Sequence, residues 1–178
     1  MTGYTRIGAL LLVATTLTFA APSSAQQAGN CSQRSAKAVP LAAKTVVYHN
    51  TEYGFCVRLP VSWRGYSIVP GDWEGYVNGE HGDQTVAKGP FISIRNPDWR
   101  SDDPRQDIPI MVFTQSQWLS VQAGEFYVSA APFPPGELGR NSEYVFALPA
   151  RYNYAFPKGF EEVDQILSGK PLRGCEEQ

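Results

Sequence analysis

The first clear pattern of apolar and polar positions lies between residues 45 and 60 and predicts a β-hairpin. Thr45–Tyr48 is rich in β-branched residues, and residues 50–52 have turn composition. Apolar side chains then alternate with small or polar ones over residues 55–59, which places Phe55, Val57 and Leu59 on one face. Pro60 ends the second strand because proline cannot donate to a β-ladder.

A short near-repeat follows this hairpin. Residues 63–66 and 73–76 both have the pattern Trp-x-Gly-Tyr, and Pro70-Gly71-Asp72 between them is a turn signal. This arrangement predicts two neighbouring antiparallel strands with tryptophans at equivalent positions. We expect Trp63 to lie in the core and Trp73 to lie nearer the surface, where acidic residues flank it.

The middle of the chain predicts two strands separated by polar loops. Residues 79–89 are polar and indicate a surface loop, 91–94 indicate a strand, and 96–107 form a charged loop. Residues 108–113 are almost continuously apolar, which is typical of a strand buried on both faces. Pro109 is expected to mark the entry to that strand.

Two helices are predicted. Thr114 and Gln117 have the spacing of a capping box ahead of a short apolar-containing segment. Near the C-terminus, apolar residues from Phe160 to Leu167 keep helical spacing, and Gly169 with Pro171 ends that helix. Between the helices, residues 126–129 and 144–148 have strand character, and residues 132–136 predict an irregular connection.

These elements predict an α+β fold, with a mainly antiparallel sheet of about six to eight strands flanked by two or three helices. We expect one domain over residues 44–178. Residues 26–43 are polar and small, and they predict a flexible lead-in.

Residues 1–25 have the layout of a secretory signal peptide. Met1–Arg6 carries one positive charge, residues 7–21 are apolar, and Ser23 and Ala25 place small residues before a cleavage site. A 15-residue apolar run is shorter than the ~20 residues that span a bilayer, and no later segment is long or apolar enough to do so. We expect cleavage after Ala25, no membrane span in the mature chain, and export to the periplasm or the extracellular space.

Charge and aromatic content narrow the class of protein further. Removal of residues 1–25 leaves 153 of the 178 residues, and Arg6 is the one charge removed, so 14 Lys and Arg face 17 Asp and Glu for a net charge of −3. That balance gives no basic surface for nucleic acid. Four Trp, nine Tyr and nine Phe favour a protein built mainly on a sheet.

Cys31, Cys56 and Cys175 would meet an oxidising compartment after export, which favours one disulfide and one remaining thiol. Three pairings are open. The ends of a domain are often close in space, so we favour Cys31–Cys175, with Cys56 as a small buried residue on its strand.

The opening of the domain resembles the PsbP/Mog1-like superfamily, in its uncharacterised secreted bacterial branch. The resemblance rests on Tyr53-Gly54-Phe55, Leu59-Pro60 and Trp63, and it covers about residues 46–68. It implies an α/β/α sandwich around an antiparallel sheet. No functional residue is implied, because the superfamily's roles in photosystem II and in small-GTPase binding belong to other compartments.

Catalytic and metal-binding patterns are weak. The chain has two histidines, and His81-Gly82-Asp83 lacks the three-ligand spacing of a catalytic zinc site. Cys56 and His49 could meet across the predicted hairpin, which is the sharpest enzymatic hypothesis, but a buried thiol beside an exposed histidine is the favoured interpretation. Asp98, Asp102, Asp103 and Asp107 lack calcium-loop spacing, and the interleaved Arg95, Arg100 and Arg105 favour charge pairing instead.

Aromatic residues near turns remain as candidate ligand contacts. Rings at Trp73, Tyr76 and Tyr152, with Arg151 and Glu74 near them in sequence, could hold a sugar or a peptide. The other interpretation is that these rings fill the core. We therefore expect an exported, non-enzymatic binding or accessory domain without a cofactor or metal, acting on an envelope protein or a small-molecule or sugar ligand. The alternative is an extracytoplasmic hydrolase with a dispersed active site.

Overall fold

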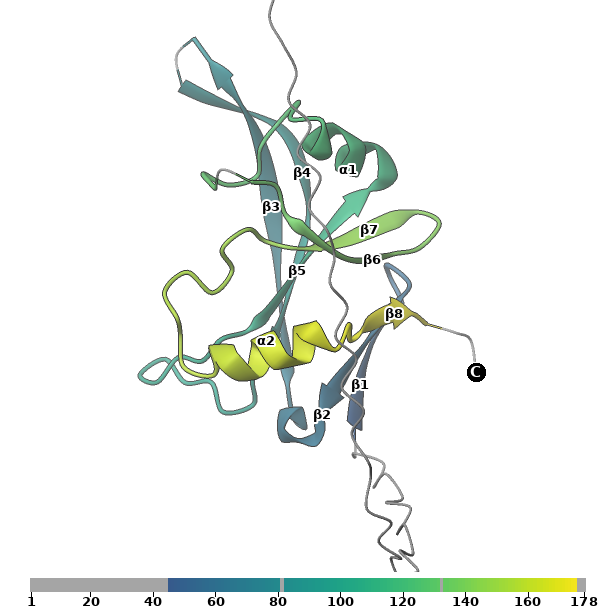
Figure 1. Ribbon diagram of the computed structural model, residues 1–178, viewed down its shortest axis with the longest axis vertical. Coiled ribbons are helices and arrows are strands. Elements are labelled where there is room, and N and C mark those ends of the chain that lie inside the picture. Colours follow the sequence, from purple (N-terminus) through teal and green to yellow (C-terminus); the bar gives the residue numbers. More distant parts are fainter. Residues whose placement is uncertain (1–44, 81, 132, 176–178) are drawn as a thin grey trace, which may run out of the picture. The chain divides into compact units, whose positions relative to one another are not determined.

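The computed structural model describes residues 45–80, 82–131 and 133–175, and these form an α+β fold (Figure 1). The described residues form two sheets, two α-helices and one short 3-10 helix. Along the chain the elements are β1 (Thr45–Asn50), β2 (Phe55–Pro60), η1 (Val61–Trp63), β3 (Ser67–Gly79), β4 (Gly82–Arg95), β5 (Ile108–Thr114), α1 (Gln115–Gln122), β6 (Gly136–Arg140), β7 (Tyr144–Leu148), α2 (Phe160–Ser168) and β8 (Leu172–Gly174).

The strands form two antiparallel sheets rather than the single sheet predicted. One sheet has the order β1-β2-β8 and the other has the order β3-β4-β5-β7-β6. The chain changes sheets between β2 and β3. Pro60 precedes the 3-10 turn η1, and Gly65 adopts a φ of 90°, so the chain turns away before β3 begins.

The first predicted hairpin is confirmed. β1 pairs with β2 in a register that sets His49 opposite Cys56. Phe55, Val57 and Leu59 are buried as the alternation predicted. The C-terminal strand β8 adds to the other side of β2 and sets Arg173 opposite Cys56. The outward face of this sheet therefore carries His49, Cys56 and Arg173 in one row.

The predicted turn at residues 70–72 and the predicted loop at residues 79–89 are wrong. Both segments belong to the long hairpin of β3 and β4, which projects beyond the rest of its sheet in Figure 1. β3 is an edge strand, so Pro70 fits where a missing N–H costs no inner ladder bond. The two Trp-x-Gly-Tyr copies are not equivalent either, because Trp63 lies in η1 and Trp73 lies in β3.

β5 and α1 follow the sequence prediction closely. Every residue from Ile108 to Phe113 is buried, and Pro109 is the second residue of the strand. The Thr114 side chain accepts from the Gln117 backbone N–H, while the Gln117 side chain accepts from the Thr114 backbone N–H. This is the predicted capping box, and it fixes the start of α1.

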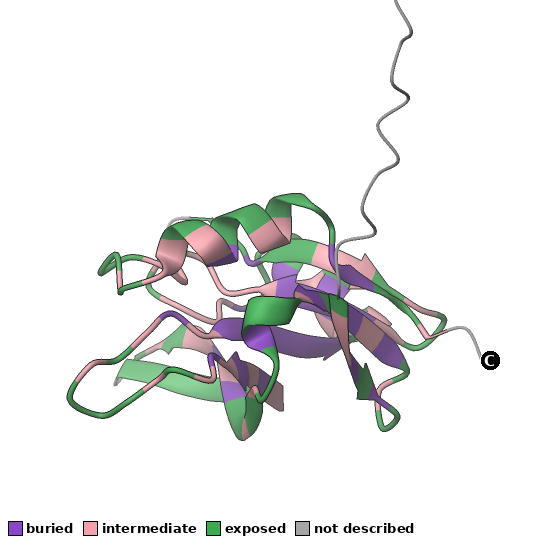
Figure 2. Ribbon diagram, turned by 90° about the horizontal axis from the view of Figure 1, so that it is seen from below, coloured by how far each residue is buried: buried purple, intermediate pink, exposed green. Residues whose placement is uncertain are grey.

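The core consists of two apolar clusters, each with a tryptophan. Trp63 lies among the inward side chains of β1, β2, β4 and β5, and Val163 of α2 covers that cluster. Trp73 packs with Phe113, Trp118 and Phe126 in the second cluster, to which α1 contributes. Buried positions in Figure 2 accordingly concentrate on the strands, whereas the helices expose their outer sides.

Two smaller expectations also change. Residues 126–129 form no strand, although Tyr127 makes an isolated antiparallel bridge with Tyr76. Residues 136–140 form β6, which composition alone did not indicate. None of the helices in the described residues has the length and apolar character to cross a membrane.

Candidate functional site

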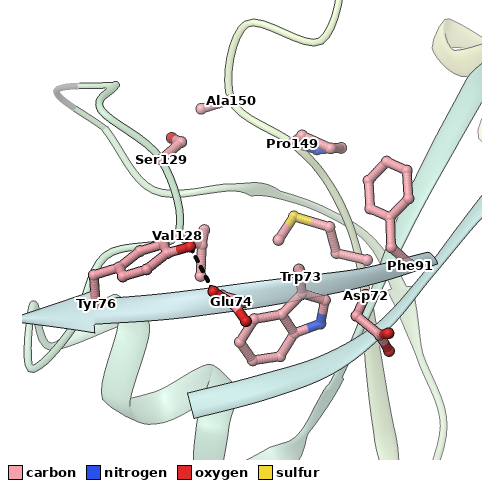
Figure 3. Close-up of a pocket in the computed structure, with 10 residues that line it drawn as sticks. Asp72, Trp73, Glu74, Tyr76, Phe91, Val128, Ser129, Pro149 and Ala150 are labelled. Carbon is pink, nitrogen blue, oxygen red and sulfur yellow. Dashed lines mark hydrogen bonds between the residues drawn. The ribbon is translucent and has the colours of Figure 1, made fainter. Parts of the chain in front are cut away.

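A cavity of about 280 Å³ opens where β3, β4 and β5 meet the segments that follow α1 and β7 (Figure 3). The strands contribute charged, aromatic and thioether side chains to it, and the two segments contribute small or apolar residues. The lining residues are Asp72, Trp73, Glu74, Tyr76, Phe91, Met111, Val128, Ser129, Pro149 and Ala150.

Glu74 and Tyr76 share one face of β3 because strand residues two apart point the same way. Tyr76 donates its hydroxyl to Glu74 Oε2 at 2.8 Å (Figure 3). Gly75 between them allows a close approach to the second core cluster, since a Cβ there would lie 2.5 Å from the Phe126 ring. The strand can therefore carry a polar pair on one face while its glycine packs against an aromatic ring on the other.

Two donors, Lys88 and Tyr76, hold the carboxylate of Glu74. Lys88 Nζ lies 2.6 Å from Glu74 Oε1, and the hydrogen bonds from Lys88 and then Tyr76 hold the pKa of Glu74 below its usual range. The same contact raises the pKa of Lys88, and donation to Glu74 raises the pKa of Tyr76. The carboxylate is thus charged at neutral pH and oriented by two donors.

The structure brings together part of the predicted ligand-binding set. Trp73 and Tyr76 line the same cavity, although Trp73 is only 4% exposed and belongs to the second core cluster. Arg151 directly follows the lining residue Ala150. Tyr152 lies elsewhere, because its ring packs against the first core cluster and its hydroxyl donates to Asp164.

Arg151 belongs to an exposed aromatic group beside the cavity. Its guanidinium carbon lies 6.0 Å from the Phe133 ring centroid and 5.7 Å from that of Tyr154. Both rings are more than half exposed. Arg151 adopts a φ of 57°, a conformation that non-glycine residues rarely adopt and that often marks functional segments.

Several lining residues gave no signal in the sequence. Met111 lies inside an apolar strand whose pattern predicts only burial. Val128, Ser129, Pro149 and Ala150 come from irregular segments, and their positions depend on how those segments pack over β3 and β5.

The disulfide joins Cys56 to Cys175, so the predicted Cys31–Cys175 pairing is wrong. Pairing of β8 with β2 brings the C-terminal end of the described chain beside Cys56, and the two Cα atoms lie 5.2 Å apart. Cys31, which the proximity of domain ends favours as the partner of Cys175, lies outside the described residues. Cys56 is half-buried and faces outward instead of lying in the core.

His49 and Cys56 meet across the hairpin, as the sequence suggested they could. His49 Nδ1 lies 3.2 Å from Cys56 Sγ. Among the described residues, His49, Cys56 and Cys175 form a group of three potential metal ligands. Their ligand atoms all lie within 4.8 Å of one another. Both sulfurs are in the disulfide, so neither is a free thiolate nucleophile or ligand in this state.

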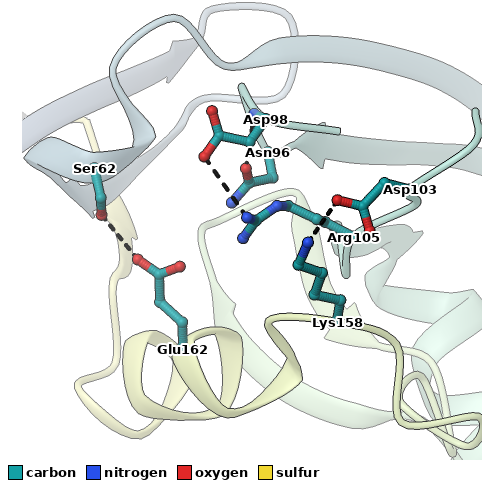
Figure 4. Close-up of polar contacts among 7 residues, drawn as sticks. All are labelled: Ser62, Asn96, Asp98, Asp103, Arg105, Lys158 and Glu162. Atoms are coloured by element: carbon teal, nitrogen blue, oxygen red, sulfur yellow. Dashed lines mark hydrogen bonds and ion pairs between the residues drawn. The ribbon is translucent and has the colours of Figure 1, made fainter. Parts of the chain in front are cut away.

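The acidic loop is organised by ion pairs (Figure 4). Asp98 pairs with Arg105 at 3.9 Å, Asp103 pairs with Lys158 at 2.5 Å, and Asp107 pairs with Arg95 at 3.1 Å. Three of the four aspartates thus have cationic partners, which supports the charge-pairing interpretation. Lys158 also connects this loop to the segment that leads into α2.

The His81-Gly82-Asp83 fragment, which lacks the ligand spacing of a catalytic zinc site, begins at His81, and that residue lies outside the described ones. None of the protein-family models, curated proteins or solved structures compared with this chain matches it. The chemistry of the cavity is therefore the basis on which a function is inferred.

Proposed function

We propose that this chain is an exported, non-enzymatic binding module that holds a sugar ring in the cavity between β3, β5 and the segment after β7. The observation that carries the proposal is the presence of one fixed carboxylate, Glu74, in a cavity whose other contacts are largely aromatic and apolar. Small-ligand sites commonly combine apolar surface with a few placed polar groups.

A sugar ring matches this combination chemically. Its C–H face can pack against Phe91, Met111 and Pro149, while its hydroxyls donate to a carboxylate. Glu74 is the carboxylate with a defined orientation, and Asp72 adds a second acceptor on the same strand. Ser129 offers a hydroxyl from the opposite segment.

The state of Glu74 favours binding over acid catalysis. A general acid must hold a proton near the working pH, and enzymes achieve this by raising a carboxyl pKa. Lys88 and Tyr76 do the reverse at Glu74. A hydrolase with a dispersed active site is the alternative, and the experiment below separates the two.

Export and family remain part of this proposal. The leader-like residues 1–25 support export, and a disulfide in the described domain is compatible with an oxidising compartment. We also propose a PsbP/Mog1-like fold on the Tyr-Gly-Phe, Leu-Pro and Trp pattern of residues 53–63. The partner would then be an envelope glycan or a protein that carries one.

A panel of oligosaccharides titrated against the mature protein tests the function, with tryptophan fluorescence as the readout because Trp73 lines the cavity. Glu74→Gln should weaken binding about tenfold or more, since it replaces the charged acceptor of the ligand's hydroxyls with a neutral amide. Glu161→Gln, on the exposed start of α2, is the matched control.

Equal affinities of these two variants, or no binding across the panel, would contradict a glycan site at Glu74. Cleavage of any oligosaccharide, followed by chromatography and abolished by Glu74→Gln, would instead establish the hydrolase alternative.

A further inference from the structure

The outward face of the three-stranded sheet holds a second cavity, of about 500 Å³, whose lining includes both cysteines of the disulfide. Strand alternation places His49, Cys56 and Arg58 on this face, and the register of β8 places Arg173 beside Cys56. Cys175 completes the disulfide. The lining residues are Val47, His49, Cys56, Arg58, Pro171, Arg173, Gly174 and Cys175.

Three features distinguish this disulfide from a purely structural one. Both cysteines are half-buried and line the cavity, so the disulfide borders the space that a small molecule would enter. His49 Nδ1 lies 3.2 Å from Cys56 Sγ, within hydrogen-bond range for sulfur. Arg58 and Arg173 are exposed and line the same cavity, which suits an anionic reactant.

We propose that Cys56–Cys175 is an exchangeable disulfide that reacts with an anionic peptide thiol bound in this cavity, and that Cys56 is the leaving sulfur. The proposal is independent of the glycan site, which lies on the other sheet. A cationic or hydrogen-bond-donating neighbour stabilises a thiolate, and the thiol that forms the more stable thiolate leaves more readily.

Two equivalents of the incoming thiol supply the electrons that reduce the disulfide. The thiolate of the first equivalent attacks Cys175 Sγ, the Cys56–Cys175 bond breaks, and a mixed disulfide forms at Cys175. The electron pair of the broken bond goes to Cys56 Sγ, which His49 stabilises by donating a hydrogen bond. A second equivalent of the thiol then attacks the mixed disulfide, which leaves Cys175 reduced and releases the oxidised dimer of the peptide thiol.

The experiment uses the mature protein in a Cys31→Ser background, so that the third cysteine does not react. Reduced glutathione is added under native conditions, free thiols are trapped with iodoacetamide at intervals, and peptide mapping locates both modifications. We expect glutathione on Cys175 and the trapping group on Cys56. Adducts predominantly on Cys56, or reaction only after unfolding, would overturn the proposal.

His49→Ala should slow formation of the mixed disulfide about tenfold or more, because it removes the donor to the leaving thiolate. His49 is exposed, and near-ultraviolet circular dichroism checks that the variant is folded. An unchanged rate in a folded His49→Ala protein would overturn the role of His49, and with it the assignment of Cys56 as the leaving sulfur.

The charge of the reactant is tested separately. Arg173→Gln should slow glutathione more than it slows cysteamine, a cationic thiol, and the comparison of the two cancels general effects on the disulfide. Arg64→Gln, an exposed arginine that does not line the cavity, is the matched control. Equal slowing of both thiols would contradict an anionic reactant.

Discussion

The two core tryptophans are buried to a similar extent but differ in how the indole N–H is satisfied. Trp63 is fully buried, and its Nε1 has no hydrogen-bond partner among the described residues. Trp73 is 4% exposed and donates Nε1–H to the Val112 carbonyl at 2.8 Å. Trp73 therefore contributes a buried polar contact as well as ring packing.

We expect Trp63→Ala and Trp73→Ala each to reduce the free energy of unfolding by about 3–5 kcal/mol, the usual cost of deleting a buried aromatic ring. The expectation that Trp73 lies near the surface is corrected, because no turn exists at residues 70–72 and the ring packs on Phe113 and Phe126. Denaturant melts of both variants measure the losses. A loss below about 0.5 kcal/mol at Trp73 would be typical of an exposed residue and would contradict its core position.

Replacement by phenylalanine should separate the two sites further. Trp73→Phe leaves the Val112 carbonyl without its donor, whereas Trp63→Phe removes an N–H that has no partner. We therefore expect Trp73→Phe to lower the midpoint of urea unfolding more than Trp63→Phe does. The reverse order would show that ring volume outweighs the hydrogen bond.

The titration of the Glu74 carboxyl gives a prediction that also concerns single residues. Its folded-state pKa lies below the usual range, so the interactions of its charged form are present above the unfolded-state pKa and disappear as pH falls through the folded value. Lys88→Gln removes the largest cause and should move the Glu74 titration to higher pH. Carbon-detected NMR of the side-chain carboxyl measures this. Coincident titrations in the parent and the variant would contradict the Lys88 contact.

At the scale of elements, α1 is connected to the sheet through its first turn. Gln117 accepts from the Thr114 N–H and also donates from Nε2 to the Lys88 carbonyl of β4. Gln117 therefore links the start of α1 to the strand whose Phe91 lines the candidate site and whose Lys88 contacts Glu74.

Thr114→Ala should cost about 1 kcal/mol of stability, since it removes the side-chain acceptor for the Gln117 N–H. Ser120→Ala, within the same helix, is the control, because alanine favours helix interiors and no cap is lost. Thermal or urea melts compare the two variants. A Thr114→Ala protein as stable as Ser120→Ala would show that the cap is not required.

The sequence predicted those elements whose pattern depends on local burial. The hairpin of β1 and β2, the buried strand β5, the capped helix α1 and the amphipathic helix α2 all have a clear periodicity or end signal. The sequence also correctly indicated strand at residues 91–94 of β4 and 73–76 of β3. It missed the strand character of residues 82–89, because that part of the hairpin is exposed and polar, which resembles loop composition. Pro70 indicates a turn when only the local sequence is read. A strand can hold this proline because β3 is an edge strand, and that is a property of the assembled sheet.

The candidate site was predictable only along β3. Trp73, Glu74 and Tyr76 are close in sequence, so their composition identified them together. Met111, Ser129 and Pro149 reach the same cavity through strand order and loop packing, for which no local pattern exists. Tyr152 does not line this cavity for the same reason. Its neighbour Arg151 follows the lining residue Ala150 in sequence, whereas the Tyr152 ring packs on the first core cluster.

At the scale of the whole described domain, the C-terminal strand joins elements distant in sequence. β8 pairs with β2, and Leu172 packs in the first core cluster with Trp63. The disulfide adds a covalent link between positions separated by 119 residues. Almost all of the described fold therefore lies within the loop that this bond closes.

A link across so long a loop restricts the unfolded chain strongly, and we expect it to contribute about 2–4 kcal/mol to stability. The test compares Cys56→Ala/Cys175→Ala with the disulfide-bonded protein, both in the Cys31→Ser background. Removing the bond should lower the urea midpoint and raise the denaturant slope, because the unfolded chain then exposes more surface. The same protein reduced by a thiol reagent controls for side-chain loss at the two positions. Equal midpoints with and without the bond would show that β8 docks through its strand pairing and the packing of Leu172 alone.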